Sequence, residues 1–204
     1  MKIIKPRFVI EDKIDGEQIL KNLERYGRTC YKSEDKITPD SARKFVATIL
    51  KSGHESVIEH EKVTVRVVCD RGVTHEIVRH RIGSYSQEST RYCNYRSRGI
   101  QVIEPFFFVG DEDKYKIWLN AMYACEKAYN ALIEAGATPQ EARSVLPNSL
   151  KNEIVITYNL REWRHFFKLR CSKRAHPQMR EIALPLLREF QRLLPVIFDD
   201  VVEE

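Results

Sequence analysis

One segment of the chain concentrates side chains that bind phosphate groups and pyrimidine rings. Arg79, His80 and Arg81 follow one another, and Ser89 and Arg91 come after a gap of seven residues. A planar guanidinium donates paired hydrogen bonds to phosphate or to the edge of a base, and hydroxyl groups add further donors. The alternative is a solvated polar loop, because charged runs usually lie on the surface. The residue types alone leave both interpretations open.

The basic residues gather in two parts of the chain, although the net charge is only +5. Residues 79–98 hold five arginines against one carboxylate, and residues 161–180 hold seven lysines and arginines against one. Two local basic regions favour discrete anionic ligands over a nucleic-acid footprint across the whole surface. A non-catalytic RNA- or single-stranded DNA-binding protein that uses both regions is the alternative function.

The composition predicts a globular cytoplasmic protein without a metal. The chain has 204 residues, 43% of them hydrophobic, which is enough for a buried core. No apolar run reaches the length of a signal-peptide core or a membrane span. The five cysteines form no C-x-x-C pair and the six histidines no H-E-x-x-H pattern, so neither a disulfide framework nor a zinc site is expected.

Hydrophobic periodicity predicts both strands and helices. Strands are expected over residues 1–10, 63–69 and 154–158, and helices over residues 16–26, 38–51, 70–81, 112–135, 138–146 and 177–194. Asp70 and Asn159 are predicted N-caps, Gly83 a helix stop, and Arg143 a residue inside the short helix that follows residue 138. Because strict βαβ alternation is absent, the expected class is α+β: a mixed, mainly antiparallel sheet with helices packed around it. With no linker or repeat, residues 1–204 are expected to form a single domain.

The Arg-His-Arg triplet that begins at Arg79 and is followed, seven residues later, by Ser89 resembles the signature of the flavin-dependent thymidylate synthases. Gln87 and Arg91 fit the extended form of that signature. Further matching segments cover most of the chain, in the order and at the separation that the family has: residues 53–60, 143–147, 159–161 and 165–170.

By this resemblance the chain binds two ligands. FAD would be held by Ser56, Arg79, His80, Arg81, Gln87, Asn159, Arg161 and His165. Deoxyuridine monophosphate (dUMP) would be held by Glu76, Arg79, Gln87, Ser89, Arg91, Arg143 and Arg170. The family has either an acid or an amide at the positions of Glu76 and Gln87, so the resemblance does not fix the hydrogen-bond polarity there.

The same resemblance implies the reaction, a reductive methylation of dUMP. Methylenetetrahydrofolate would give the one-carbon unit and NADPH the reducing equivalents, while FAD supplies the redox chemistry, so no protein nucleophile is needed. Arg170 is the expected catalytic residue, because its permanent charge stabilises a deprotonated, enolate-like uracil ring. Ser89 is expected to bind the nucleotide rather than attack it. The family forms homotetramers with sites where subunits meet, and no nucleic-acid or membrane partner is expected.

Overall fold

The computed structural model describes residues 1–202, apart from the side chain of Arg98. The last two residues of the predicted domain and that one side chain of the first basic region therefore lie outside the described residues. The described chain groups into two compact units. The first unit comprises Met1–Val9, Arg66–Arg79 and Tyr85–Val155, and the second comprises Ile10–Val65, His80–Ser84 and Ile156–Glu204.

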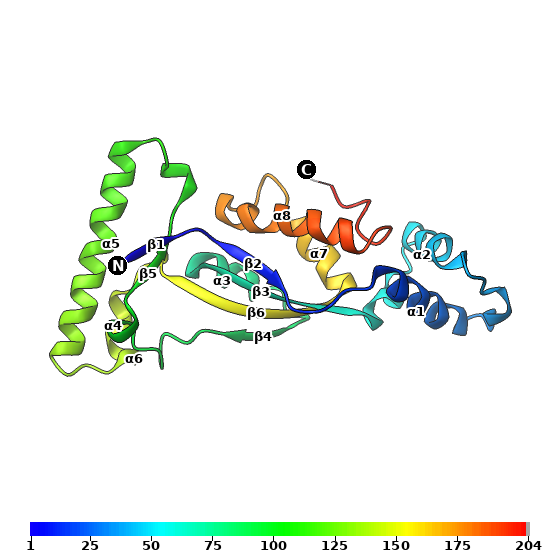
Figure 1. Cartoon of the computed structure of the whole chain (residues 1–204), viewed down its shortest axis with the longest axis horizontal. Coiled ribbons are helices and arrows are strands. Elements are labelled where there is room, and N and C mark those ends of the chain that lie inside the picture. The colour runs from blue at the N-terminus through cyan, green and yellow to red at the C-terminus, as the bar shows by residue number, and fades with distance from the viewer. Residues whose placement is uncertain (203–204) are drawn as a thin grey trace. The chain divides into compact units, whose positions relative to one another are not determined.

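The first unit contains one long helix, α5 (Glu112–Glu134), which packs on two short parallel strands (Figure 1). Trp118 and Tyr129 of α5 share a buried cluster with Val102, and partly buried Ile3 packs against this cluster. Ile3 and Val102 are also register partners in the parallel pair of β1 and β5. The other elements of this unit include β1 (Lys2–Ile4), α3 (Arg71–Ile77), α4 (Tyr95–Arg98), β5 (Gln101–Ile103), η3 (Phe106–Phe108), α6 (Pro139–Ala142) and η4 (Arg143–Val145).

The second unit is mainly helical and has an aromatic core. Helix α1 packs on α2, and α7 packs on both α8 and η2. Trp163 and Phe167 of α7 meet Phe190 of α8 with ring centroids 5.0 and 5.1 Å apart, and Phe198 closes the same cluster. The elements of this unit include α1 (Gly16–Thr29), η1 (Glu34–Lys36), α2 (Ser41–Lys51), η2 (Glu55–His60), α7 (Leu160–Arg170) and α8 (Pro177–Leu193).

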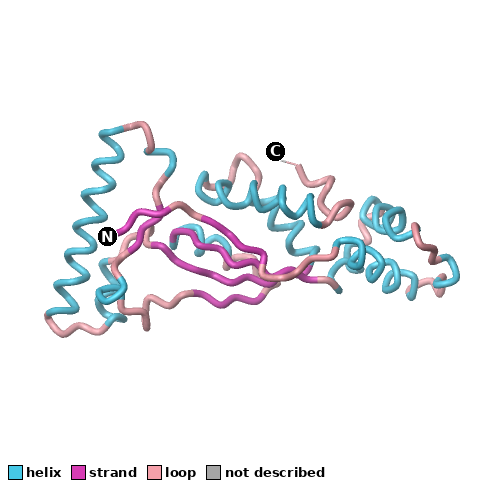
Figure 2. Tube along the Cα trace, viewed as in Figure 1, coloured by secondary structure: helices cyan, strands magenta, loops and turns pink. Residues whose placement is uncertain are grey.

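A four-stranded sheet has the order β2-β3-β6-β4 (Figure 2). Its strands are β2 (Arg7–Ile10), β3 (Lys62–Asp70), β4 (Ser84–Gln87) and β6 (Lys151–Asn159). Alternate residues of β6 are buried, from Asn152 to Tyr158, as the period of two predicts. The α+β class with an open antiparallel sheet is thereby confirmed, with β1 and β5 as a separate parallel pair. Among residues 1–202, no helix is long and apolar enough to cross a membrane.

Helix α3 is shorter than predicted. Asp70 caps it as expected, by accepting a hydrogen bond from the backbone N–H of Val73 at 2.9 Å, but the helix ends at Ile77. The basic triplet therefore lies beyond the helix, because β4 begins at Ser84 and draws the chain into an extended path. Gly83 is not the helix stop. A Cβ atom at Gly83 would lie 2.3 Å from the ring of Tyr158, so its missing side chain permits a close approach to β6.

Other element boundaries also differ from the prediction. Residues 1–10 form two strands instead of one, because Pro6 interrupts the strand and has no N–H to donate. Helix α2 begins at Ser41, so Pro39 precedes the helix instead of occupying its first turn. Arg143 is the C-cap of α6 and starts η4, so it lies just after the short helix that was expected to contain it.

Candidate active site

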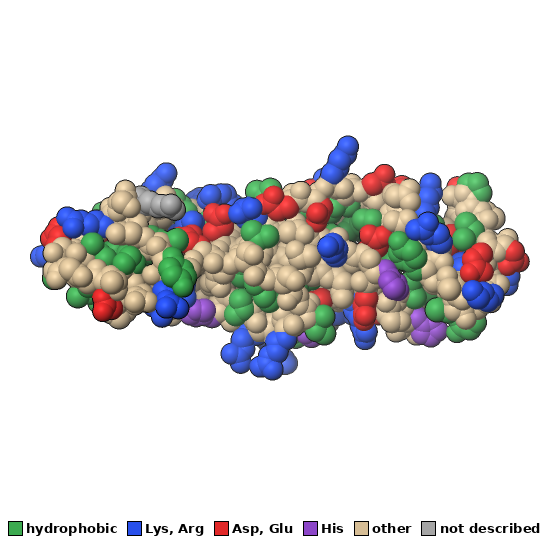
Figure 3. Space-filling view, turned by 90° about the horizontal axis from the view of Figure 1, so that it is seen from below, with side chains coloured by type: hydrophobic (Ala, Val, Ile, Leu, Met, Phe, Trp, Pro, Cys, Tyr) green, Lys and Arg blue, Asp and Glu red, His purple; other side chains and the backbone are tan. Residues whose placement is uncertain are grey.

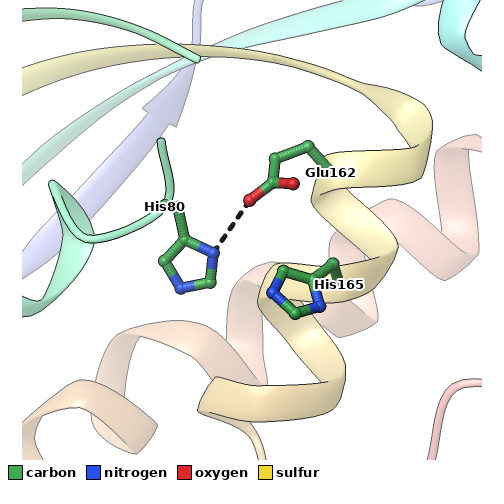
Figure 4. Close-up of side chains that lie close together, drawn as sticks. All are labelled: His80, Glu162 and His165. Carbon is green, nitrogen blue, oxygen red and sulfur yellow. Dashed lines mark hydrogen bonds and ion pairs between the residues drawn. The ribbon is translucent and has the colours of Figure 1, made fainter. Parts of the chain in front are cut away.

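Three side chains of the second unit lie close together, two of them buried and one, His165, exposed. His80 lies in the segment that follows α3, and Glu162 and His165 extend toward it from α7 (Figure 4). The N-cap Asn159 starts α7 by accepting a hydrogen bond from the backbone N–H of Glu162 at 2.8 Å, as the sequence predicted. The spacing of three residues then brings Glu162 and His165 to the same side of the helix.

Both ring nitrogens of His80 are engaged. Nδ1 lies 3.0 Å from Oε1 of Glu162, and Nε of Arg170 donates to Nε2 of His80 at 3.0 Å. Arginine has no acceptor, so Nε2 of His80 must be the unprotonated nitrogen. The ring is therefore neutral, and the proton on Nδ1 is donated to the Glu162 carboxylate.

The surroundings of His80 favour the same protonation state. Burial is the largest effect that lowers the pKa of His80 to about 4, and the positive charge of Arg170 and then of His165 acts in the same direction. Burial also raises the pKa of Glu162 above its usual value, while His165 opposes that rise. At neutral pH the centre is a neutral imidazole between a carboxylate and a guanidinium.

Two other arginines of α7 have different surroundings. Arg164 is only 2% exposed, and it donates to both carboxylate oxygens of Asp200 at 2.5 and 2.7 Å and to Glu55 at 3.2 Å. Arg161 is exposed and donates to Glu59 at 2.6 Å. An exposed ion pair contributes little to stability, so Arg161 is available to an anionic ligand, whereas Arg164 anchors the C-terminal segment to α7.

The residues expected to bind FAD lie mostly in the second unit, and Arg79 and Gln87 are the two of them that lie in the first. Ser56 in η2 and Arg81 after α3 are exposed, as is His165. These side chains are accessible to a ligand that lies along the surface of the second unit.

Two members of the expected FAD set are already committed to contacts within the protein. His80 uses both ring nitrogens, and Asn159 uses its carbonyl oxygen to cap α7. A new hydrogen bond from the imidazole of His80 to a ligand would require the loss of one of these two bonds, whereas Oδ1 of Asn159 keeps a second lone pair.

The residues expected to bind dUMP lie in the first unit, with the exception of Arg170. Ser89 forms a tight turn in which its Oγ accepts from the backbone N–H of Arg91 at 3.2 Å. The guanidinium of Arg91 donates from Nε to Gln140 at 3.0 Å and lies 5.3 Å from the ring centre of Tyr92. Glu76 is partly buried on α3.

A cavity of about 290 Å³ in the first unit brings together residues that were not expected to meet. Arg143 lines it with Arg71, Thr90 and Asn148. Thr90 stands between the two predicted nucleotide ligands Ser89 and Arg91, so the turn they form borders this cavity. Two guanidinium groups and a hydroxyl are a suitable set of donors for a phosphate monoester.

Sequence reasoning missed Arg71, which is the first residue of α3. One signal was present in the sequence. The first turn of a helix favours acidic side chains, so a cation directly after the N-cap Asp70 is at an unfavourable position for helix stability alone. Such a residue is a candidate for ligand binding.

Gln87 has a fixed orientation in the first unit. Its Nε2 donates to Oγ1 of Thr74 at 2.9 Å and to Oδ1 of Asn152 at 2.8 Å. Asn152 is fully buried and donates in turn to the backbone carbonyl of Glu88 at 3.0 Å. Both amide protons of Gln87 are therefore used internally, and its carbonyl oxygen is the atom that remains for a ligand.

A second, larger cavity of the first unit, about 500 Å³, is lined by a row of paired charges. Lys151 lies 2.6 Å from Glu88 and 3.7 Å from Glu153, which accepts from Arg66 at 2.6 Å. Tyr95 donates to Glu88 at 2.9 Å, and burial together with this carboxylate raises the pKa of Tyr95. Because these charges satisfy one another, the row explains the packing of β3, β4 and β6 better than it explains ligand binding.

The cluster of His80, Glu162 and His165 also has the composition of a metal site, since its potential ligand atoms lie within 4.8 Å of one another. The contacts of His80 argue against that use. A metal bound to Nδ1 would replace the proton that Nδ1 donates to Glu162, and the guanidinium held on the other side of the ring would repel a divalent cation. The prediction of a site without a metal stays a prediction.

Comparison with known proteins identifies the family. The sequence matches the Thy1 family, described as thymidylate synthase complementing protein, over residues 14–196. A flavin-dependent thymidylate synthase from Geobacter sulfurreducens is 38% identical over 85% of this chain and 78% of its own length. The chain belongs to the flavin-dependent thymidylate synthase family. Another enzyme of that name, from Pyrococcus abyssi, is 37% identical over 81% of this chain and 70% of its own length.

A solved structure of the same fold belongs to PolB, a UMP/dUMP methylase from Streptomyces cacaoi bound with 5-Br dUMP. It matches all of both chains with a TM-score of 0.85, at 20% sequence identity. The fold of the flavin-dependent thymidylate synthase family is thus retained at low identity. The resemblance seen in the motif at Arg79 to Ser89 is confirmed at the level of family, whereas the ligand roles of individual residues stay predictions.

Proposed function

We propose that this protein is a flavin-dependent thymidylate synthase that converts dUMP to dTMP with FAD as cofactor, methylenetetrahydrofolate as one-carbon donor and NADPH as reductant. The observation that carries the proposal is the placement of Arg170. Within a chain whose relatives are named for this activity, its Nε is held 3.0 Å from a ring nitrogen of the Arg-His-Arg motif. This contact joins the two basic regions of the sequence at one centre.

The accessible residues of the second unit suit the chemistry of FAD. Its pyrophosphate requires cations and hydrogen-bond donors, and Arg81, Arg161, Ser56 and His165 supply them from exposed positions. Arg161 would exchange its exposed partner Glu59 for the ligand. When bound, FAD supplies the hydride chemistry that amino-acid side chains lack.

The first unit supplies the groups that suit the nucleotide. The cavity of Arg143, Arg71 and Thr90 matches a phosphate monoester in its donors, and the turn from Ser89 to Arg91 borders it. The fixed carboxamide of Gln87 presents an acceptor, which suits a ring N–H of uracil. Glu76 and Arg79 are proposed as further nucleotide ligands.

Arg170 is proposed as the residue that activates the uracil ring. Methylation at C5 of the uracil ring requires electron density there, which grows as negative charge develops on the ring nitrogen and carbonyl oxygen that are conjugated with this carbon. A guanidinium stays charged at every physiological pH and stabilises the resulting anion. No protein nucleophile is part of this scheme, and Ser89 is proposed only to bind.

We further propose that the active form is a homotetramer in the cytoplasm, as the family resemblance implies. Sites assembled from several copies would draw the nucleotide residues of the first unit and the flavin residues of the second from different subunits. Light scattering of the FAD-loaded protein tests this assembly, and a monomer that is fully active would contradict it.

The charges on one face of the protein favour small anionic ligands over nucleic acid. On the face shown in Figure 3, lysine and arginine side chains occur in small groups with acidic side chains between them. A sequence-independent nucleic-acid site requires a continuous basic track. Separate basic groups suit small anionic ligands.

The visible absorption spectrum of the protein after FAD reconstitution tests the proposal. Flavin bands that shift on addition of dUMP, but not on addition of deoxyuridine at the same concentration, would support a shared site that recognises the phosphate. A protein that retains no FAD, and instead binds oligonucleotides in a strongly salt-dependent way, would favour the nucleic-acid alternative.

A further inference from the structure

A chain of two hydrogen bonds connects α7 to itself through His80. Glu162, in the first turn of α7, accepts from Nδ1 of His80, and Nε2 of His80 accepts from Arg170 at the end of the same helix. Each bond is 3.0 Å long. His80 thus links the two ends of α7 from outside the helix.

The direction of both bonds is fixed by chemistry. The guanidinium of Arg170 can only donate, so Nε2 of His80 accepts, and the remaining ring proton lies on Nδ1. The carboxylate of Glu162 then holds this tautomer, because a charged acceptor strengthens the bond from Nδ1. The opposite tautomer would place two N–H groups face to face at Arg170.

The packing around His80 also restrains the ring. Its centroid lies 5.1 Å from that of Phe166, 6.1 Å from that of Tyr158 and 5.5 Å from that of His165. His80 is 4% exposed and Glu162 is 6% exposed. Water therefore has little access to this pair, and the ring has one orientation in which both of its bonds form.

We infer that His80 and Glu162 are positioning residues that orient the guanidinium of Arg170, and that the imidazole of His80 does not bind FAD through its ring nitrogens. The catalytic role of Arg170 rests on the proposed function, but the hydrogen-bond relay does not. With Nε held by His80, the two terminal nitrogens of Arg170 point in a fixed direction, and in the proposed function they act on the substrate. A rotated or displaced guanidinium would meet it at the wrong angle.

The tautomer of His80 tests the relay without any assay of activity. Nitrogen-15 spectra of the histidine-labelled protein report which ring nitrogen carries the proton, and comparison with His80→Gln assigns the signals. The titratable or charged groups that face this ring are Glu162, His165 and Arg170. The expected result is a neutral ring that is protonated on Nδ1 between pH 6 and 8. A ring protonated on Nε2, or one that titrates freely near pH 6.5, would overturn the relay.

Two substitutions at Glu162 test its effect on Arg170. Glu162→Leu removes the acceptor, whereas Glu162→Gln keeps a carbonyl oxygen in nearly the same shape. Both remove the same charge from the first turn of α7, so the difference between them isolates the hydrogen bond. Glu189→Gln, which breaks an exposed pair with Arg192 on α8, serves as the control.

Glu162→Leu is expected to lower kcat for dUMP methylation about 100-fold, the cost of a displaced reacting group. In Glu162→Leu, KM for dUMP is expected to change less than threefold, and the FAD content is expected to equal that of the control. The kcat of Glu162→Gln is expected to be at least tenfold higher than that of Glu162→Leu. Equal kcat in both variants and the control would show that the relay positions nothing. If the FAD content of Glu162→Leu decreased in proportion to its activity, His80 would instead be a candidate FAD ligand, and the inference would be overturned.

Different results would refute the proposed function and the positioning role of His80 and Glu162. If the unmodified protein forms no dTMP, the proposed function fails, and the nitrogen-15 spectrum still decides whether His80 is held as described. If the unmodified protein forms dTMP and the spectrum shows the Nδ1 tautomer, unchanged kcat in a folded Glu162→Leu protein refutes the positioning role alone. If Glu162→Leu does not fold, Glu162→Gln is compared with the control Glu189→Gln instead. The kcat of Glu162→Gln is expected to be two- to tenfold lower than that of the control, and an equal kcat would contradict the inference.

Discussion

The Nε atom of Arg170 lies 3.0 Å from Nε2 of His80, although 90 positions separate the two residues in the sequence. One residue belongs to the Arg-His-Arg motif and the other ends α7. Their contact joins the two basic regions, both of which the family resemblance assigned to the binding of FAD and dUMP. The acceptor of this bond is a neutral imidazole, which orients Nε of the guanidinium through a hydrogen bond without an opposite charge.

Replacing Arg170 with alanine is expected to abolish methyl transfer while FAD binding and flavin reduction continue. The physical reason is that alanine removes the permanent positive charge that Arg170 holds beside Nε2 of His80. The decrease in dTMP formation should exceed about 100-fold, since electrostatic stabilisation in a protected site is worth that much or more. Arg170→Lys is the control for charge without the planar fork, and normal turnover in Arg170→Ala would contradict the assignment.

The stability of the fold is expected to depend on pH through His80. Its pKa falls to about 4 in the folded protein from 6.5, its ordinary value, so between these two pH values the unfolded chain takes up a proton that the folded chain does not. This favours unfolding by about 1.4 kcal/mol for each unit of pKa difference. The stability linked to His80 is therefore complete above pH 6.5 and decreases as the pH falls toward 4.

Denaturant unfolding of the unmodified protein and of His80→Gln at several pH values measures that dependence. The slope between pH 4.5 and 6.5 should be smaller in His80→Gln, because glutamine does not titrate. Identical slopes in the two proteins would mean that His80 has an ordinary pKa in the folded state.

Replacing Ser89 with alanine is expected to weaken nucleotide binding without stopping the reaction. The hydroxyl stabilises the turn through Arg91 and is a proposed phosphate donor, so KM for dUMP should rise about tenfold, the value of one hydrogen bond to a charged group. The maximal rate at saturating dUMP should stay within a few-fold of normal. Complete inactivity at saturation would contradict a role limited to binding and would reopen the question of a nucleophilic Ser89.

Arg71→Gln is expected to raise the dissociation constant for dUMP more than that for deoxyuridine. Arg71 and Arg143 line the same cavity, so loss of either guanidinium removes a partner of the phosphate. A charged hydrogen bond is worth about 1.5–3 kcal/mol, which corresponds to about a tenfold or greater effect on dUMP. Flavin difference spectra provide the titration, and an equal effect on both ligands would place Arg71 outside the phosphate site.

Gly83→Ala is expected to destabilise the second unit. The added methyl group would lie 2.3 Å from the ring of Tyr158, which is 1% exposed and cannot swing into solvent. Overpacking of this kind costs about 1–3 kcal/mol. Thermal unfolding measures the loss of stability. Gly99→Ala is unsuitable as a control, because Gly99 has a φ of 75° and alanine would be strained there. Ala137→Gly, at a position outside any helix or strand, controls for a change of one methyl group.

Local sequence signals predicted the long elements well. The alternation of β3 and β6, the caps at Asp70 and Asn159, and the end of α5 before Gly136 depend on neighbours within a few residues, so the sequence contains the information. The strand β4 was missed because its polar residues Ser84 to Gln87 show no apolar alternation. Its position is set by pairing with β6, a contact across the chain.

The motifs predicted candidate ligand residues, whose roles stay predictions, whereas the contacts between these residues were not predicted. Acidic residues are common in the first turn of a helix, and Glu162 has such a position. Its presence in the sequence therefore gave no sign of the bond to His80. Arg164 and Arg161 look alike in sequence, yet one is buried against Asp200 and the other is exposed. Such differences arise from packing between distant segments, which no local pattern encodes.

Formation of dTMP by the purified protein tests the central claim most directly. The reaction mixture would contain dUMP, methylenetetrahydrofolate and NADPH, with either FAD-loaded or FAD-stripped protein, and the nucleotides would be separated by chromatography. The proposed function predicts dTMP only with the FAD-loaded protein and none when any one of the three substrates is omitted. Failure of the FAD-loaded protein to form dTMP, or equal formation after complete removal of FAD, would contradict it.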